Sequence, residues 1–399
     1  MNRSGILLAA PIFLAAGTSM VATDLYLPAI PFLPEALSGD AVGAQYTLAG
    51  FFASFAVGQL VFGALADRYD RRLILNWALA AFTVASIGCA LAESMKELIA
   101  LRFVQGIAAS AGTALAPAML REAGDDSLVV RLTSIVSSME AVIPALAPMI
   151  GAWLVVAFGW ESTFWVMAAF ALFTMAAFRF LRIHSRPPHN PNFTAAHLRY
   201  WHLLLARRFM GYQVSHAFAF AGLIIFLMAT PYLLVTYLGH STKAFVVMQL
   251  VMISFFVIVS NLAGRLSDRF GINSLIVAGA VLQMLSALLF VGLIGLFPQF
   301  LSAVTMTLTM IPMAVGLGLR VGPGFAKAMA FAGRHPGSAG GLMMFTCMGL
   351  SAAGTQFVAP TLMAGPFWLA IVVLVCCAAS LALLPIAMRP EPEGFAAGE

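Results

Sequence analysis

Charged residues are scarce in this chain of 399 residues. They make up 9% of it, whereas 61% of the residues are hydrophobic and the mean hydropathy is +0.96. A soluble globular domain is nearer to a quarter charged. The scarcity of charge therefore excludes an ordinary soluble protein and predicts one that crosses a membrane many times. The net charge of +5 does not indicate nucleic-acid binding, because the basic residues sit in short segments between apolar runs.

Cysteine is also rare, and its positions exclude two kinds of site. All four cysteines lie inside apolar runs and lack the spacing of metal ligands: Cys89, Cys347, Cys376 and Cys377. We interpret them as packing residues and expect neither a disulfide nor a metal site. The sequence also lacks a nucleophile triad, and VGPGFAK at 321–327 is too short and irregular for a phosphate-binding loop. We therefore expect no cofactor and no enzyme activity.

Twelve apolar runs have about the length of a transmembrane helix, roughly 20 residues. They cover residues 6–30, 44–66, 73–92, 98–119, 130–157, 160–181, 209–237, 245–265, 273–293, 298–319, 337–361 and 366–388. A polar stretch, 182–208, separates the first six from the last six. The sequence thus predicts an all-α membrane protein with 12 transmembrane helices in two pseudo-symmetric six-helix bundles. These would be an N-terminal bundle at 1–181, a cytoplasmic linker at 182–208 and a C-terminal bundle at 209–399.

Arginine and lysine are distributed unevenly between the loops. If the N-terminus is cytoplasmic, nearly all of them fall on the cytoplasmic side, with Arg320 and Lys327 in the loop after the tenth run. Only Lys96 and Lys243 fall on the opposite side, and Arg102 lies within a span. By the positive-inside rule, this bias predicts that both termini and the linker are cytoplasmic.

A charged octapeptide recurs 201 positions further along the chain. It reads GALADRYD at 63–70 and GRLSDRFG at 264–271, each time after an apolar run, and we expect both copies in cytoplasmic loops. A repeat at half the chain length is common in transporters built from two related halves.

Three ionisable residues interrupt the predicted spans: Asp24, Arg102 and Glu140. A charge in the hydrocarbon region is costly, so each marks a functional hypothesis. All three lie in the first half, and between residues 162 and 390 the only carboxylate is Asp268. Burial favours a neutral carboxyl group and a nearby arginine favours the ionised one, so Asp24 or Glu140 could exchange protons near Arg102. The alternatives are that Asp24 caps the first span and that Glu140 fixes the fifth through a salt bridge.

Several polar residues within the apolar runs are candidates for a binding pocket. Together with Asp24 and Glu140, they are Tyr26, Gln105, Tyr212, His216 and Tyr232. Such a pocket would be mostly apolar with a few polar groups. The alternative is helix packing and, for His216, an interior histidine with its hydrogen bonds satisfied.

Four motifs in order carry a resemblance to a known family. TDLYLPAIP begins at Thr23, GALADRYDRR at Gly63, LRFVQGIAAS at Leu101 and PALAPMIGAW at Pro144. Each lies on the span where that family carries it. The chain resembles a twelve-span member of the major facilitator superfamily of the drug:proton antiporter type, close to the bicyclomycin and chloramphenicol resistance branch.

The resemblance implies roles for these residues. Asp24 and Arg102 are implied in proton coupling, with Glu140 as a second carboxylate. A conformational latch is implied for the repeated signature, namely Gly63, Asp67, Arg68 and Arg71 with Gly264, Asp268 and Arg269. Pro144, Pro148 and Gly151, spaced i, i+4 and i+7, resemble the antiporter motif of a bent helix. The family usually has glycine at position 70, and we expect Asp70 to tolerate the left-handed conformation there.

The sequence therefore predicts a proton-coupled exporter of small amphipathic compounds, a multidrug transporter working by rocker-switch alternating access in the bacterial inner membrane. Its partners would be the cargo, protons and the lipid bilayer, without nucleic acid, and we expect a monomer. Two alternatives stay open. One is a dedicated exporter of a single metabolite, such as a siderophore, sugar or amino acid. The other is a non-transporting membrane receptor, which would not need buried ionisable groups together with a repeated latch motif.

Overall fold

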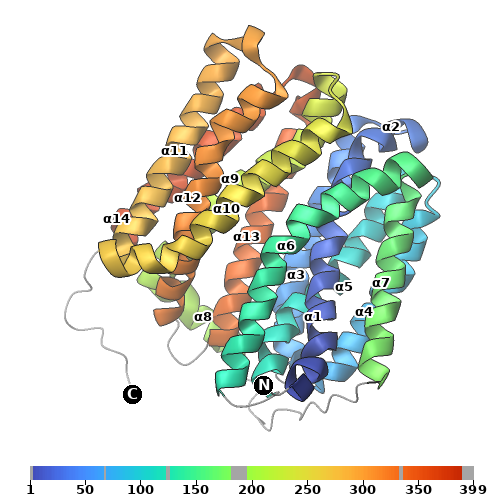
Figure 1. Ribbon diagram of the computed structural model, residues 1–399, viewed down its shortest axis with the longest axis vertical. Coiled ribbons are helices and arrows are strands. Elements are labelled where there is room, and N and C mark those ends of the chain that lie inside the picture. The colour runs from blue at the N-terminus through green and yellow to red at the C-terminus, as the bar shows by residue number, and fades with distance from the viewer. Residues whose placement is uncertain (1–2, 67–68, 123–125, 181–195, 332–335, 389–399) are drawn as a thin grey trace.

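The computed structural model describes residues 3–66, 69–122, 126–180, 196–331 and 336–388, and these residues form helices without a strand (Figure 1). The long helices are α1 (Arg3–Asp24), α3 (Ala41–Ala66), α4 (Arg71–Ala90), α5 (Met95–Glu122), α6 (Asp126–Phe158), α7 (Glu161–Phe180), α9 (Arg207–Pro231), α10 (Thr242–Phe270), α11 (Ile272–Leu296), α12 (Ala303–Ala330), α13 (Pro336–Val358) and α14 (Phe367–Met388). The short ones are α2 (Leu33–Ala36), α8 (Ala196–Leu205), η1 (Leu27–Phe32), η3 (Tyr232–Tyr237), η4 (Pro298–Phe300) and η5 (Ala359–Ala364). Within the described ranges, 11 segments are long and apolar enough to cross a membrane, and α6 adds the apolar stretch Val142–Phe158. The predicted all-α membrane fold is confirmed.

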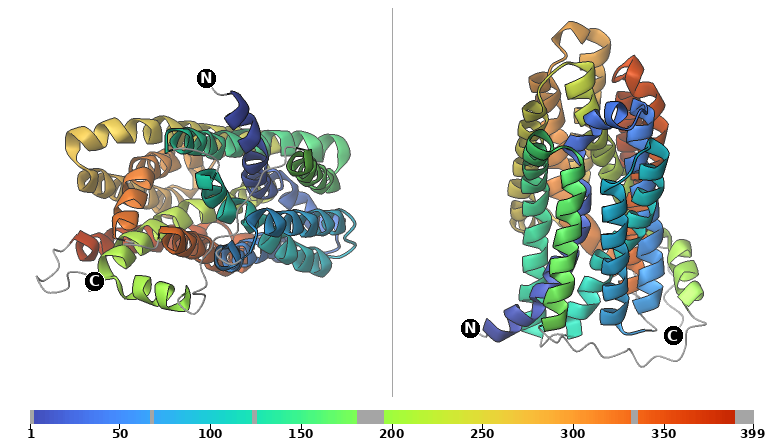
Figure 2. Two further views of the ribbon diagram at one scale, coloured as in Figure 1. Left: turned by 90° about the horizontal axis from the view of Figure 1, so that it is seen from below. Right: turned by 90° about the vertical axis from the view of Figure 1, so that its right-hand side faces the viewer.

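Three long helices end in irregular turns at the same end of the bundle. α1 is followed by the 3-10 segment η1, α9 by the π-helical segment η3, and α13 by the 3-10 segment η5. Each transition contains a proline, which lacks the N–H that would continue an α-helix: Pro28, Pro231 and Pro360. We refer to this end as the η1 end and to the opposite end, where α8 lies, as the α8 end (Figures 1 and 2).

The helix contacts of the first half recur in the second. α5 packs against α1, α3 and α4, and α12 packs against α9, α10 and α11 in the same order along the chain. The division into bundles at 1–181 and 209–399 with a linker at 182–208 stays a prediction. Part of the predicted linker is helical, because α8 lies within it.

Glycines let these helices approach backbone to backbone. A Cβ atom on Gly106 would overlap the carbonyl oxygen of Phe51, which shows how closely α5 lies on α3. A Cβ atom on Gly316 of α12 would likewise overlap the carbonyl oxygen of Gly279 on α11. Such contacts suit membrane helices, because packing replaces the hydrophobic effect as the force between them.

The two halves meet chiefly through α3 against α13 and α6 against α10. At the η1 end, Gln45 Nε2 donates a hydrogen bond to the carbonyl oxygen of Met228 at 3.4 Å, and η1 contacts η3. In Figure 1, α6 and α10 approach each other toward the η1 end and diverge toward the α8 end. The halves are therefore joined more closely at the η1 end on this face.

We predict that Gly316→Val lowers the stability of the solubilised protein by about 1–3 kcal/mol, because the added side chain must push α11 and α12 apart. Thermal unfolding in detergent would measure the change. Gly292→Val is the matched control, since a Cβ atom there meets nothing within 4 Å. Equal melting temperatures of the two variants would contradict the packing described here.

Candidate functional site

Arg102 is fully buried in α5, and its surroundings satisfy only part of its guanidinium group. Nη1 donates to the carbonyl oxygen of Ala22 at 3.2 Å and to Gln105 Oε1 at 2.6 Å. The Cζ atom lies 4.4 Å from the centre of the Tyr26 ring and 4.1 Å from that of Phe51. Cation–π contacts of this kind stabilise a desolvated guanidinium group. Among the described residues, Nε and Nη2 have no hydrogen-bond partner.

Tyr26 and Gln105 form the wall around Arg102. Gln105 Nε2 donates to Ser86 Oγ at 2.7 Å, and the Tyr26 hydroxyl lies 2.6 Å from Thr47 Oγ1. Both side chains are completely buried, so neither is open to a ligand in this conformation. The structure therefore places these two predicted pocket residues where they position Arg102.

Asp24 is the last residue of α1 and lies between two fixed points of the backbone. Ala22 accepts a hydrogen bond from Arg102, and Leu25 lies so close to α6 that a Cβ atom on Gly151 would overlap its carbonyl oxygen. Asp24 itself is partly exposed, whereas Ala22 and Leu25 are buried. Its carboxyl group forms no hydrogen bond or ion pair with any described residue. The backbone contacts on both sides thus fix the position of Asp24, although its side chain has no partner among the described residues. Asp24 does not cap α1.

The predicted antiporter motif lies on α6, which is one continuous helix through Pro144 and Pro148. Pro148 and Gly151 are buried, and Gly151 makes the close contact with Leu25. Glu140 lies on the same helix, but its side chain is outside the described residues. The motif glycine therefore brings α6 against the turn that carries Asp24.

The remaining pocket candidates do not come together. Tyr212 packs at the α8 end, where its hydroxyl donates to Asn273 Oδ1 at 3.2 Å and its ring stacks on Phe331. Tyr232 lies 20 residues further, where η3 begins, which is about 30 Å along the helix at 1.5 Å per residue. His216 lies between them and is buried. In this conformation α9 spreads these residues along its length and does not bring them together, and their part in a binding pocket stays a prediction.

The first copy of the repeated signature surrounds the turn from α3 to α4. Asp67 and Arg68 lie outside the described residues. Arg71 Nε donates to the carbonyl oxygen of Ala66 at 3.2 Å and so covers the end of α3. Gly63 lies within α3, and a Cβ atom there would be 3.7 Å from the hydroxyl of Tyr200 on α8.

Asp70 does not adopt the left-handed conformation that we expected. Its φ is −59°, and its carboxylate accepts hydrogen bonds from the backbone N–H groups of Arg72, at 2.8 Å, and Leu73, at 3.3 Å. Asp70 is thus the N-cap of α4, and an N-cap residue needs negative φ. The aspartate replaces the conformational freedom of glycine with a direct stabilisation of the helix start.

The second copy is not in a loop, which corrects another prediction. Residues 264–270 belong to the last turns of α10, because nothing in GRLSDRF breaks a helix. Gly271, with φ of 83°, makes the turn into α11. Gly264, Asp268 and Arg269 are exposed, and Arg269 lies over the ring of Phe270.

Arg320 is a buried charge that our sequence analysis placed in a cytoplasmic loop. It is 1% exposed inside α12. Nη1 donates to Gln283 Oε1 at 3.1 Å and to Ser380 Oγ at 2.5 Å, and Nη2 donates to Ser215 Oγ at 2.8 Å. The expectation that every buried charge lies in the first half is therefore wrong. The predicted tenth span, 298–319, stops one residue before Arg320. The segments on both sides of Arg320, 314–319 and 321–326, are uncharged, which indicates that the helix continues through it.

Comparison with known proteins agrees with this arrangement. Residues 12–355 match the family model described as Major Facilitator Superfamily. The chain belongs to the major facilitator superfamily. It is therefore a transporter and not an enzyme, and the resemblance inferred from the four motifs is confirmed.

Named relatives point to the same group. The chain is 31% identical to a chloramphenicol resistance protein of Pseudomonas aeruginosa over 290 residues, which cover 69% of this chain and 67% of the relative. It is 28% identical to the uncharacterized MFS-type transporter YdgK of Bacillus subtilis over 80% of each chain. It is also 28% identical to the multidrug resistance protein MdtL of Escherichia coli O139:H28, over 54% of this chain and 55% of the relative.

A solved structure shows the same fold. A mutant of the nucleoside transporter NupG aligns with a TM-score of 0.67 over 96% of this chain and 99% of its own, at 14% sequence identity. This likeness supports the superfamily fold and carries no statement about cargo.

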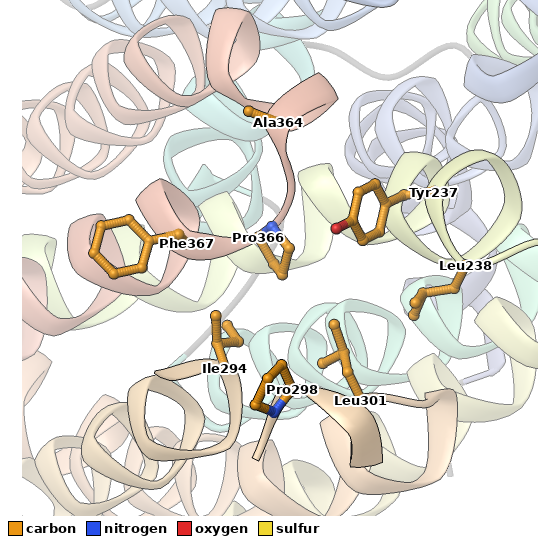
Figure 3. Close-up of a pocket in the computed structure, with 8 residues that line it drawn as sticks. All are labelled: Tyr237, Leu238, Ile294, Pro298, Leu301, Ala364, Pro366 and Phe367. Atoms are coloured by element: carbon orange, nitrogen blue, oxygen red, sulfur yellow. The ribbon is translucent and has the colours of Figure 1, made fainter. Parts of the chain in front are cut away.

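A hollow of about 330 Å³ lies at the η1 end of the second half (Figure 3). It is lined by Tyr237, Leu238, Ile294, Pro298, Leu301, Ala364, Pro366 and Phe367. The Tyr237 hydroxyl points toward the space beside Pro366. The hollow includes none of the predicted site residues.

We predict that Gly151→Val increases the exposure of Asp24, because the added side chain must displace the Leu25 backbone. The expected result is several-fold faster labelling of Asp24 by a hydrophobic carbodiimide, read by mass spectrometry of the solubilised protein. Gly349→Val is the control, since a Cβ atom there meets nothing within 4 Å. Unchanged labelling in Gly151→Val would show that α6 does not hold this turn.

Proposed function

We propose that the protein exports small amphipathic compounds in exchange for protons, with Asp24 as the acid that binds and releases the proton. The observation that carries the proposal is the position of Asp24. Asp24 is partly exposed as a residue, and its carboxyl group has no partner in the described structure. The residue lies between a contact with Arg102 at Ala22 and a contact with Gly151 at Leu25. A change of charge there acts directly on the packing of α1 against α5 and α6.

The coupling follows from electrostatics. Arg102 keeps its positive charge, and it contacts the backbone two residues before Asp24. In a conformation that brings the two side chains together, an ionised Asp24 is attracted to this guanidinium group, whereas a protonated one is not. Binding of a proton therefore changes the free energy that holds the end of α1 against α5. A transporter needs such a difference between two conformations if proton entry is to drive cargo out.

The membrane arrangement that fits this proposal is the bacterial inner membrane, with both termini and α8 on the cytoplasmic side. The names of relatives, a chloramphenicol resistance protein and the multidrug resistance protein MdtL, support drug-like cargo. The divergence of α6 and α10 toward the α8 end, with their approach toward the η1 end, supports alternating access between the two halves (Figure 1). In this conformation Asp268 of the second signature is exposed and has no partner among the described residues, as expected for a latch that is released.

We predict that Asp24→Asn abolishes proton-coupled efflux while expression and membrane insertion stay normal, because the amide cannot exchange a proton. Growth-inhibition assays across chemically varied toxins, with cells expressing each form, would identify cargo. Proton release from everted vesicles on adding each hit would then test exchange directly. Glu93→Gln is the control, because that carboxylate is exposed in the turn between α4 and α5 and belongs to none of the predicted site residues.

Normal resistance and transport by the Asp24→Asn variant would overturn the assignment. The breadth of the growth panel separates multidrug export from export of one metabolite. Protection against several unrelated compounds supports the first, and protection against a single chemical series supports the second.

A further inference from the structure

The guanidinium group of Arg320 is buried without a negative partner. Between residues 162 and 390, the only carboxylate in the sequence is Asp268, which is exposed at the α8 end of α10. The contacts of Arg320 within the described structure are neutral oxygens on three other helices: Ser215 on α9, Gln283 on α11 and Ser380 on α14. An unpaired charge inside a membrane protein is costly and marks a functional site by default.

The donors that Arg320 leaves unused belong to Nε and Nη2. An arginine has five N–H donors. The hydrogen bonds to Gln283, Ser380 and Ser215 use both donors of Nη1 and one of Nη2. Nε has no partner among the described residues, so Nε and the second donor of Nη2 remain. Nε and Nη2 are the two nitrogens of the side of a guanidinium group that binds a carboxylate or phosphate through two parallel hydrogen bonds.

A second unused polar atom lies beside the same turn of α12. His216 Nδ1 has no hydrogen-bond partner in the described structure, although the side chain is only 7% exposed. A Cβ atom on Gly324 would lie 3.7 Å from this nitrogen. Gly324 follows Arg320 by four residues, so the two lie on the same face of the helix. The imidazole and the guanidinium group therefore border one region between α9 and α12.

α12 also offers a route from the α8 end to this region. Arg320, Gly324 and Lys327 are spaced i, i+4 and i+7 and share one face of the helix. Lys327 is partly exposed and has no hydrogen bond or ion pair within the described structure. Pro323 lacks an N–H, so α12 is without its hydrogen bond to the Leu319 carbonyl oxygen. This turn, with glycine on both sides of the proline, is the part of α12 that loosens most easily.

We propose that this turn of α12 is an anion-binding site. Arg320 binds the carboxylate or phosphate-like group of a small ligand through Nε and Nη2, His216 donates a further hydrogen bond, and Lys327 attracts the anion from the α8 end. This proposal is independent of proton-coupled efflux, because binding of an anion at Arg320 does not require that protons drive transport. It also explains why the second half keeps a buried arginine although its sequence up to residue 390 has one carboxylate, the exposed Asp268.

The test is binding to the purified full chain in lipid nanodiscs, measured by calorimetry and by thermal shift. Benzoate is the probe and benzamide is its neutral counterpart of nearly the same shape. We expect benzoate to bind and to raise the melting temperature in proportion to its concentration, and benzamide to do neither. No proton gradient is present, so the outcome is independent of the Asp24 proposal.

Two variants locate the site. Arg320→Gln removes the guanidinium group, and Gly324→Val places bulk beside His216 without removing a hydrogen bond of Arg320. Each should weaken benzoate binding at least about tenfold, because charge-assisted hydrogen bonds are the strongest polar contacts an anion makes. The control is Arg207→Gln at the start of α9, which changes an exposed arginine of the same half and should leave benzoate binding as in the wild type. If Arg320→Gln does not fold, Gly324→Val decides the result.

Competition identifies the source of the anion. Displacement of benzoate by chloride or inorganic phosphate at millimolar concentration would mean that simple inorganic anions occupy the site, and its absence would mean an organic carboxylate. Equal binding of benzoate and benzamide would overturn the proposal. Unchanged benzoate affinity in both variants, or no binding of benzoate, phosphate or chloride, would overturn it too and leave Arg320 as a tether between helices.

Discussion

A guanidinium group inside a membrane protein has to be surrounded by protein atoms that replace water, and each half of this transporter is built around one such group. In the first half, Arg102 on α5 contacts the end of α1 and the rings of Tyr26 and Phe51. In the second half, Arg320 on α12 contacts α9, α11 and α14 through hydroxyl and amide oxygens. Separating these helices would leave a buried charge without partners, which is strongly unfavourable. The two arginines therefore favour movement of each half as a unit.

The two groups do not occupy equivalent places. α5 and α12 have the same length, 28 residues, and pack in the same way, but Arg102 lies in the third turn of α5 and Arg320 lies ten residues from the end of α12. Arg102 is thus nearer the η1 end and Arg320 nearer the α8 end. The place in α5 that corresponds to Arg320 by helix position is Gly112, where a Cβ atom would overlap the carbonyl oxygen of Ala15. At equivalent positions of two helices that pack alike, α12 thus has a buried charge and α5 has a close contact with a neighbouring helix.

The sequence predicts the scaffold well because hydrophobicity along the chain is enough to locate membrane spans. It also identifies Arg102, since a charge within a long apolar run stands out. It does not reveal what surrounds Arg102, because Tyr26, Phe51 and Ser86 come from separate helices. Arg320 was missed for a related reason. A basic residue near the end of an apolar run usually indicates that a loop begins there. The structure shows instead that α12 continues for ten residues past Arg320.

The sequence also does not determine how a polar residue is used within its helix. Asp70 was expected to imitate glycine, but an aspartate can instead accept hydrogen bonds from the first N–H groups of a helix, and that is the conformation it takes. Tyr212 was expected in a pocket, but its position near the start of α9 places it in the packing at the α8 end. Both cases show that a polar residue in a membrane protein is often used to complete a helix end or a helix contact. The position in the helix has to be known before a role is assigned.

If Asp24 binds the proton, as we propose, the distribution of acids limits how this change of charge can act on the second half. Asp24 is next to the fixed contacts of the first half, and the only carboxylate of the second half between residues 162 and 390 is the exposed Asp268. A charge change at Asp24 must therefore cross at the contacts between halves near the end of α1. These are the packing of η1 on η3 and the hydrogen bond from Gln45 to the Met228 carbonyl oxygen. Since η1 directly follows the turn that holds Asp24, a shift at the end of α1 acts first on this junction. Motion of the second half is then a response to the first, transmitted through packing rather than through a second titrating group.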